Sequence, residues 1–387
     1  MTDYQTNKTI PYLPIIKVIG FGGGGSNAID RMQDFGLKGV DFIAANTDRQ
    51  SLRNSQADET IQLGPLLTRG LGAGGRPEIG QKAAEESYQE IAQTLEGADM
   101  VFLTAGMGGG TGTGSIPVAA KIAKELDILT IAVVTTPFSF EGGVRKKNAT
   151  EGLRQLQPHV DTLITIPNER LLKAVQRQTT FLEAFLLADD VLRQAVQSIV
   201  ELITEPGTIN VDFAHIEHLM RLGGGALMSI GHGTGPNKAV KAVQQALYHP
   251  LLEDISLTNA SGMIVNFSAG HDLTLGEIGE ALGFLQEQAS GNLELIFGTT
   301  NKEEMVNQVQ INMVITGLGA ITFEDAFSAI KKERVKEFSL NQPVLRERKA
   351  QPSNTSHKTD PPQIAVGIND LDVPAFIRQG VRLSTGN

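Results

Sequence analysis

The chain lacks cysteine and tryptophan, and it has no long apolar run. Its 387 residues include 0 Cys, 0 Trp and only 4 Tyr. Without cysteine there can be no disulfide framework and no thiolate metal site, and a reducing compartment is the natural setting. No stretch approaches the roughly 18 to 20 apolar residues that span a bilayer, and residues 1–8 are too polar for a signal-peptide core. We therefore expect a cytoplasmic protein without direct membrane insertion.

Basic charge is also scarce. The chain has 33 Lys and Arg against 43 Asp and Glu, a formal net charge of −10. Nonspecific nucleic-acid binding needs clustered Lys and Arg, and base stacking needs aromatic side chains, so we expect no nucleic-acid partner. A chain of this length exceeds one ordinary core and indicates two domains.

Glycine, by contrast, is abundant and concentrated. Six of the nine residues from Gly106 to Gly114 are glycine, and two others are threonine. This stretch follows an apolar run typical of a buried strand, 100–105, and precedes a helical pattern over 116–126. A tight turn would need only one or two glycines. A strand, a glycine loop and a helix start together present backbone N–H groups and a positive helix dipole to an anion. The stretch therefore predicts a phosphate-binding loop.

Two more glycine-rich segments occur in the first half of the chain. One spans 20–27 after a predicted strand at 15–20, and the other spans 70–78 before a predicted helix over 79–95. The first, together with Asp48, is also typical of a dinucleotide site, but one pyrophosphate needs only one such loop. Two loops at the ends of two strands of one sheet could instead grip a triphosphate from both sides. The segment at 70–78 could equally be a surface connection.

Strands and helices alternate over about 14–170, which predicts a parallel sheet covered on both faces. Further strands are expected at 41–45, 129–134 and 162–166. Charged residues beyond the end of a strand in such a sheet are candidates for ligand contacts. Glu141 and Arg145 fit that description for ribose and phosphate, although they could equally form a solvated ion pair.

The second half begins with a long predicted helix and continues as a smaller domain. The helix, 180–204, would be about 37 Å long and would end at Pro206 and Gly207. A second α/β domain with a mixed sheet follows. Its predicted elements are strands at 222–230, 262–267, 293–297 and 309–316 and helices at 236–248 and 274–289. We interpret Gly223 to Gly225 as packing glycines and not as a further phosphate loop.

The end of the chain changes character. The segment 329–367 is rich in charged residues and proline, which predicts a disordered linker. An apolar segment returns within 368–387, around Leu371, Val373 and Phe376. Isolated after a linker, it is typical of a peptide that docks in a partner's groove, with a frayed tail as the alternative.

Several motifs together resemble the FtsZ family of bacterial cell-division GTPases, which are tubulin homologues. The most specific is Gly108 to Gly114, the tubulin-family signature. The resemblance covers about 14–325 and the tail, and no Gly-x-x-x-x-Gly-Lys-Ser/Thr loop of a P-loop NTPase is present. The supporting motifs are Gly22 to Asn27, Asn46 to Asp48, Pro137 to Gly142, Asn210 to Ala214 and Asp372 to Arg378.

The resemblance implies a domain plan for the whole chain. It comprises a flexible arm (1–12), a GTP-binding domain with a parallel sheet (13–179), a central connecting helix (180–205), a C-terminal activation domain (206–328), a disordered linker (329–367) and a partner-docking tail (368–387).

The resemblance also implies GTP or GDP as the ligand, with Mg²⁺. Gly23 to Asn27 and Gly110 to Gly112 would hold the phosphates, Glu141 the ribose and Arg145 the phosphate chain. Asn27, Asn168 and Asp189 would surround guanine, with Phe185 against its ring. A carboxylate can accept from guanine N1–H and the N2 amine, and the choice between Asp189 and Asp190 stays open. The full set of candidate nucleotide-binding residues is Gly22, Gly23, Gly24, Gly25, Ser26, Asn27, Gly74, Gly108, Gly109, Gly110, Thr111, Gly112, Thr135, Glu141, Arg145, Asn168, Phe185 and Asp189.

Finally, the resemblance implies head-to-tail filaments that form a division ring at mid-cell, since non-closing heterologous contacts generate filaments. The tail, over 368–380, would bind a membrane-tethering division protein, FtsA-like or similar. The loop from Asn210 to His215 of one subunit would complete the catalytic site of the next.

The family places acids at two positions of that catalytic loop, and here Asp212 is followed by His215. Neutral imidazole can orient water, but it supplies neither a negative charge nor a hard ligand for Mg²⁺. We therefore expect slow hydrolysis and long-lived filaments, unless His215 is simply tolerated at a solvated helix start. One alternative is a regulatory paralogue that copolymerises and barely hydrolyses GTP. A nicotinamide or flavin oxidoreductase is a more distant one.

Overall fold

The computed structural model describes residues 13–172, 178–205, 207–209, 211–252, 260–288 and 293–318. The expectations for the N-terminal arm, the linker, the docking tail and Asn210 lie outside these residues.

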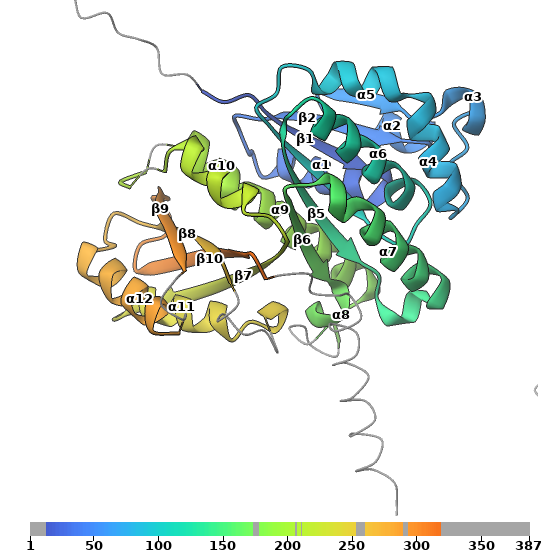
Figure 1. Ribbon diagram of the computed structural model, residues 1–387. Helices are drawn as coiled ribbons and strands as arrows, with labels where there is room; N and C mark the ends of the chain where they lie inside the picture. The colour runs from blue at the N-terminus through green and yellow to red at the C-terminus, as the bar shows by residue number, and fades with distance from the viewer. Residues whose placement is uncertain are drawn as a thin grey trace, which may run out of the picture. The chain divides into compact units, whose positions relative to one another are not determined.

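The described part of the chain contains a ten-stranded sheet in the order β3-β2-β1-β4-β5-β6-β7-β10-β8-β9 (Figure 1). From β1 to β6 every pairing is parallel, as predicted. The strands are β1 (Ile16–Phe21), β2 (Asp41–Asn46), β3 (Glu59–Gln62), β4 (Met100–Gly106), β5 (Leu129–Thr136), β6 (Thr162–Pro167), β7 (Gly225–Thr234), β8 (Gly262–Ala269), β9 (Glu294–Asn301) and β10 (Gln308–Thr316).

Helices cover both faces of the parallel strands. Side chains of one face pack with α1, α9 and α10, and those of the other face pack with α4 to α6 and α7. The α-helices are α1 (Gly22–Asp34), α2 (Arg49–Asn54), α3 (Pro65–Thr68), α4 (Pro77–Glu86), α5 (Tyr88–Leu95), α6 (Thr111–Glu125), α7 (Gly143–Leu156), α8 (Asn168–Leu171), α9 (Phe181–Thr204), α10 (Phe213–Arg221), α11 (Lys238–Leu247) and α12 (Leu275–Gln288), with short 3₁₀ turns η1 (Ser139–Glu141), η2 (Gln157–His159) and η3 (Pro250–Leu252). No helix in the described ranges is both long enough and apolar enough to cross a membrane.

The central strands have apolar sequences because helices bury both faces of the sheet. All eight residues of β5 are buried, and Ile131 and Val133 face one core while Ala132 and Val134 face the other. A strand buried on both faces must be apolar at consecutive positions, which is why its pattern is a continuous run and not an alternation.

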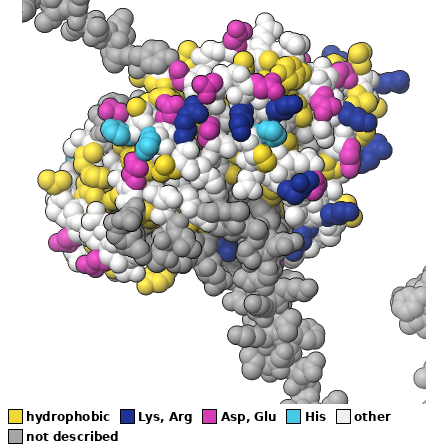
Figure 2. Space-filling model, in the orientation of Figure 1, with side chains coloured by type: hydrophobic (Ala, Val, Ile, Leu, Met, Phe, Trp, Pro, Cys, Tyr) yellow, Lys and Arg dark blue, Asp and Glu magenta, His cyan; other side chains and the backbone are white. Residues whose placement is uncertain are grey.

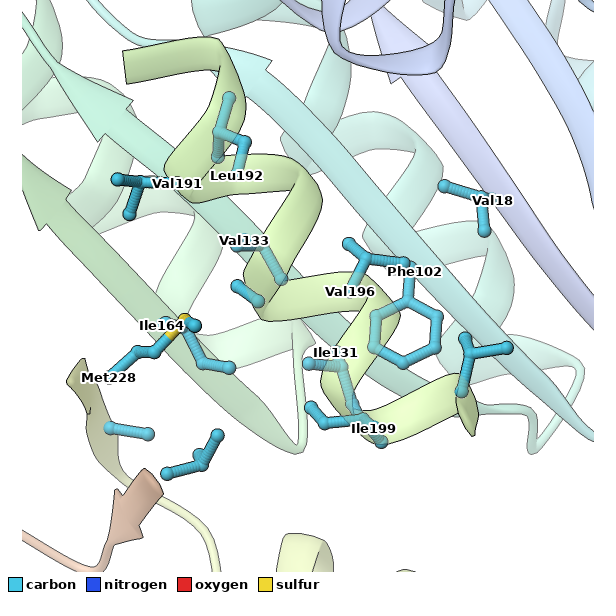
Figure 3. Packing of buried hydrophobic residues seen from close by; sticks show 14 of the residues in the cluster. Val18, Phe102, Ile131, Val133, Ile164, Val191, Leu192, Val196, Ile199 and Met228 are labelled. Atoms are coloured by element: carbon cyan, nitrogen blue, oxygen red, sulfur yellow. The ribbon is translucent and has the colours of Figure 1, made fainter. Parts of the chain in front are cut away.

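The long helix α9 begins one residue after the predicted start and ends at the predicted residue, and it packs along one face of the sheet. It begins with a capping box between Thr180 and Glu183, which satisfies backbone donors of the first turn. Its apolar side chains lie against strand residues that include Phe102 and Val133 (Figure 3). This helix also contacts β8, β9 and β10, so it connects the two halves of the described chain.

The smaller half has the predicted mixed sheet. β10 pairs antiparallel with β7 and β8, and β8 pairs parallel with β9, while α11 and α12 cover one face. Two residue pairs, Leu163 with Gly225 and Ile164 with Ala226, join β6 to β7. The strands of the two halves therefore form one continuous sheet, a feature that the sequence analysis did not predict.

The prediction of a single helix over 79–95 is wrong, because α4 ends at Glu86 and α5 starts at Tyr88. The side chain of Ser87 provides the reason. Its hydroxyl donates to the carbonyl of Gln62 at 3.3 Å and accepts from the N–H of Gly64 at 3.1 Å. These bonds fix the helix break against the end of β3.

Candidate functional site

Three helices begin at one edge of the parallel sheet. The neighbouring strands β1, β4 and β5 lead to α1, α6 and α7, and no side chain caps the N-terminus of any of the three. Their free N–H groups and positive dipole ends therefore gather at this carboxyl edge, where an anion is stabilised. α6 starts at Thr111 and not near Ile116 as predicted, so the end of the glycine stretch is the first turn of the helix.

The glycines of this edge fall into two classes. A Cβ on Gly114 would lie 2.0 Å from the carbonyl oxygen of Pro77, and one on Gly112 would lie 2.9 Å from that of Phe21. These glycines allow α6 to pack closely on α4 and β1. Gly23 and Gly109, in contrast, would meet nothing within 4 Å. Close packing is therefore a second role of the glycine stretch, beside the phosphate binding that the sequence predicts.

This division predicts opposite outcomes for two alanine substitutions. Gly114→Ala would place a methyl group 2.0 Å from the carbonyl oxygen of Pro77 and so force α6 away from α4. Because backbone atoms on both sides would have to move, the substitution should destabilise the domain by about 3 kcal/mol or more. Gly109→Ala should leave the thermal unfolding midpoint nearly unchanged and weaken nucleotide binding. Unfolding scans and binding titrations on both variants test this. Equal destabilisation would contradict the division.

Both threonine hydroxyls of the glycine stretch are held by the protein. The hydroxyls of Thr111 and Thr47 are 2.6 Å apart, and that of Thr113 accepts from the N–H of Gly108 at 2.8 Å. Gly108 has a φ of +111°, and a Cβ there would lie 2.9 Å from the carbonyl oxygen of Arg145. Thr113 therefore fixes a loop conformation that favours glycine.

Glu141 and Arg145 pair with each other, but the Glu141 side chain is only 10% exposed, so this is not the fully solvated ion pair of the alternative. Their Oε2 and Nη1 atoms are 2.7 Å apart, and the other carboxylate oxygen of Glu141 accepts from the N–H of Phe138 at 2.9 Å. The Arg145 side chain is 56% exposed, so it can rotate toward a ligand without unfolding anything. Thr135 is buried in β5, where its hydroxyl oxygen would lie 3.7 Å from a Cβ on Gly106.

Candidate base-binding groups come from three helices. Asn27 is exposed on α1, Asn168 begins α8, and Asp189 lies partway along α9, which packs against α1. Within the described part of the chain, the side-chain oxygens of Ser26 and Asn168 are buried without a hydrogen-bond partner. Such orphaned polar atoms fit a polar ligand at this place.

The structure distinguishes the two adjacent aspartates. Asp190 accepts from Arg193 Nε at 2.7 Å and from Gln194 Nε2 at 2.6 Å. Asp189 accepts no hydrogen bond from the described residues, and burial raises its pKa to about 6, with the charge of Arg31 acting in the opposite direction. Asp189 is therefore the carboxylate that is available to a ligand, and an acid whose pKa is raised by desolvation is a candidate functional group.

An aromatic cluster that the sequence analysis missed lies beside Phe185. The ring of Phe185 is 5.2 Å from that of Phe138 and 4.7 Å from that of Phe181, and Phe140 stacks on Phe138. The four-residue spacing from Phe181 to Phe185 on a helix was the available signal. The cluster fixes the position of the Phe185 ring.

Asp212 and His215 do not lie near the glycine loops. They occupy the start of α10, with His215 Nδ1 and Asp212 Oδ2 3.9 Å apart and both side chains mostly exposed. The other end of α10 is tied to the amino ends of β5 and β6, since Arg221 lies 3.6 Å from Asp161, which accepts from the N–H of Thr130. On the face shown in Figure 2, histidine side chains lie among acidic ones in the region of α10. The predicted catalytic residues thus belong to the opposite edge of the sheet.

Comparison with known proteins agrees with this architecture. Residues 15–176 match the GTPase domain of the Tubulin/FtsZ family, and residues 224–319 match the FtsZ family C-terminal domain. The chain is 44% identical to the cell division protein FtsZ of Pseudomonas aeruginosa, over 97% of this chain and 99% of that protein.

Solved structures show the same similarity. An empty FtsZ dimer from M. jannaschii superposes with a TM-score of 0.76 at 46% identity, over 79% of this chain and 89% of that one. CetZ2 from Haloferax volcanii shares the fold, with a TM-score of 0.69 at 20% identity over 84% of this chain and 99% of that one. The chain belongs to the FtsZ family of tubulin-like cell-division GTPases.

Proposed function

We propose that this chain polymerises head to tail and that each GTP is hydrolysed between two subunits. One observation carries the proposal. The open glycines Gly23 and Gly109 lie at the carboxyl edge of the sheet, whereas Asp212 lies at the start of a helix tied to the amino edge. A site that needs both groups is completed only by a second copy, and such a heterologous contact extends into a filament.

The nucleotide would lie along the carboxyl edge. Asp189, Asn168 and the Phe185 ring would take the base, and the starts of α1 and α6 would take the phosphates. Arg145 would leave Glu141 for the phosphate chain, so that Glu141 could accept from the ribose. Mg²⁺ would neutralise part of the phosphate charge there, with ligands of the oxygen type that this ion prefers. The orphaned oxygens of Ser26 and Asn168 support this placement.

Mixing two inactive variants tests the shared site. Gly109→Asp places a negative charge in the phosphate cradle, and Asp212→Ala removes the acid of the next subunit. Each variant alone should be inactive. An equal mixture should restore turnover at up to about one quarter of the junctions, as expected for random heterologous contacts. The chain carrying both changes is the control, since it cannot restore any junction. A mixture no more active than that control would exclude the shared site.

The rate of hydrolysis is the second part of the proposal. With His215 where the family has an acid, turnover would be slow and filaments long-lived. The competing possibility is a paralogue that copolymerises with an active relative and barely hydrolyses GTP. Phosphate release from this chain alone, measured together with light scattering, distinguishes the two, because a paralogue would scatter light without releasing phosphate.

The tail would connect the filament to the division ring at mid-cell. Residues 368–380 would bind a membrane-tethering division protein in a groove, beyond the linker at 329–367. Deleting 368–387 should leave polymerisation in solution unchanged and abolish recruitment to vesicles that carry the tether. Retained recruitment would remove this assignment.

A further inference from the structure

The loop between α3 and α4 lies over the start of α6. Gly72, Gly74 and Gly75 all have positive φ values, 86°, 59° and 72°, and a Cβ on any of them would meet nothing within 4 Å. The loop nevertheless contacts the glycine signature, because a Cβ on Gly110 would lie 2.7 Å from the backbone nitrogen of Arg76. An open, glycine-rich loop is thus packed on the helix start that would receive phosphate.

One side chain of α7 bridges this loop and the signature. The Nδ2 amide of Asn148 lies 3.2 Å from the carbonyl oxygen of Gly108 and 3.4 Å from that of Gly75. Asn148 is half-buried, and α7 packs on α6, which in turn packs on α4 (Figure 1). The amide therefore donates to two segments that are separated by more than thirty residues in the sequence.

The order of the strands indicates which part of the nucleotide would lie next to this loop. The base-binding candidates Asn168 and Asp189 belong to the β6 and α9 side, and the open glycines follow β1 and β4. The loop at 70–76 comes after β3, at the far end of the same edge. A nucleotide whose base lies by α9 would therefore point its terminal phosphate toward the loop.

We infer that Asn148 is a positioning residue for the terminal phosphate, an inference that rests on the proposed nucleotide placement. Its amide holds the loop at 70–76 against the signature, so that the open glycines of the loop and Gly109 border the same phosphate. It touches no reacting atom. Since GDP lacks this phosphate, Asn148 contributes to the preference for GTP over GDP and little to the binding of GDP.

Two substitutions separate this role from general stability. Asn148→Ala removes both hydrogen bonds and should weaken GTP binding up to about tenfold, with GDP binding nearly unchanged, because each such bond is worth a modest net amount. Asn148→Asp places a carboxylate against two carbonyl oxygens and near the phosphates, so this variant should lose more GTP affinity than Asn148→Ala. Thr150→Ala is the matched control, since that hydroxyl bonds only within α7, to the carbonyl of Lys146 at 3.0 Å.

The experiment measures fluorescent GTP and GDP affinities of the full chain below its assembly concentration, and hydrogen exchange of the peptide covering 70–76 without nucleotide. We expect faster exchange of that peptide in Asn148→Ala, no change in Thr150→Ala, and a reduced ratio of GTP to GDP affinity in Asn148→Ala alone. Equal weakening of GTP and GDP, or unchanged exchange of the loop, would overturn the inference. If the wild-type chain binds neither nucleotide, the proposed function fails instead, so the two failures are distinguishable.

Discussion

Replacing His215 by aspartate is expected to raise GTP turnover per polymerised subunit by about 10² to 10⁴, the usual range for one acid–base group. The side chain projects from the first turn of α10 and is 67% exposed, so the substitution disturbs no core. An acidic residue in the first turn of a helix is also favourable, because it faces the positive end of the dipole. The change should therefore affect chemistry and leave folding intact.

The physical reason is charge at the attacking water. In the proposed junction, Asp212 and residue 215 of one subunit approach the terminal phosphate held by the next. A second carboxylate would polarise that water more strongly than a neutral imidazole does, and it would add a hard oxygen ligand for Mg²⁺. Faster hydrolysis should also shorten the filaments, which sedimentation after GTP exhaustion would measure.

His218→Asp is the matched control for this substitution. It adds the same charge to the same helix three residues later, where the side chain is 64% exposed and lies 3.6 Å from Glu294. Phosphate release per subunit should stay at the wild-type level in that variant. If both variants are accelerated alike, the effect is one of surface charge. If His215→Asp leaves turnover unchanged, the second acid is not limiting in this chain.

The sequence predicted those elements whose structure depends on local pattern. β5 begins at Leu129 as predicted and ends two residues later than predicted, at Thr136, and the uninterrupted helix α9 lies within one residue of its predicted bounds. Burial on both faces of a strand, or along one stripe of a helix, determines the residue types, so the apolar pattern indicates these elements. The helix break at Ser87 was not predictable, because it depends on hydrogen bonds to Gln62 and Gly64 in a distant segment. The junction of β6 with β7 rests on two residue pairs, which leave no periodic signal.

In the candidate site too, contacts between segments leave no local pattern in the sequence. Composition indicated a phosphate loop, but only close packing on α4 separates Gly114 from Gly109. The sequence likewise could not choose between two adjacent aspartates. That choice depends on Arg193 and Gln194, about one turn further along α9, which donate to Asp190, whereas none of the described residues donates to Asp189.

If Asp189 is the carboxylate that binds the base, its substitution should have a large effect on GTP affinity. Asp189→Asn should weaken GTP binding by about 10²-fold, because a charge-assisted pair of acceptors is replaced by an amide whose donors face the N1–H and N2 donors of guanine. Xanthine carries a carbonyl in place of the N2 amine, so the variant should gain affinity for xanthosine triphosphate. Asp190→Asn is the control, and it should leave the base preference unchanged. Affinities of both variants for the two nucleotides, measured below the assembly concentration, test the prediction.

The raised pKa of Asp189, about 6, adds a pH test with a definite sign. If the ionised carboxylate binds guanine, GTP affinity should fall about fourfold between pH 7.5 and pH 5.5 as the group takes up a proton, and the fall should be absent in Asp189→Asn. The free energy of unfolding of the nucleotide-free chain should instead receive a larger contribution from Asp189 at pH 5.5 than at pH 7.5. Burial disfavours the charged form, so the contribution of this group is favourable at low pH and is lost as pH rises through 6.

Asp189→Asn should therefore stabilise the nucleotide-free chain at pH 7.5, by on the order of 2 kcal/mol, while it impairs GTP binding. A residue whose carboxylate only supported the fold would lose stability on this substitution. Denaturant midpoints at pH 7.5 and pH 5.5, with and without GTP, separate the two roles. A destabilised nucleotide-free variant would place the carboxylate in the fold, whereas a stabilised one that no longer responds to GTP would place it against the base.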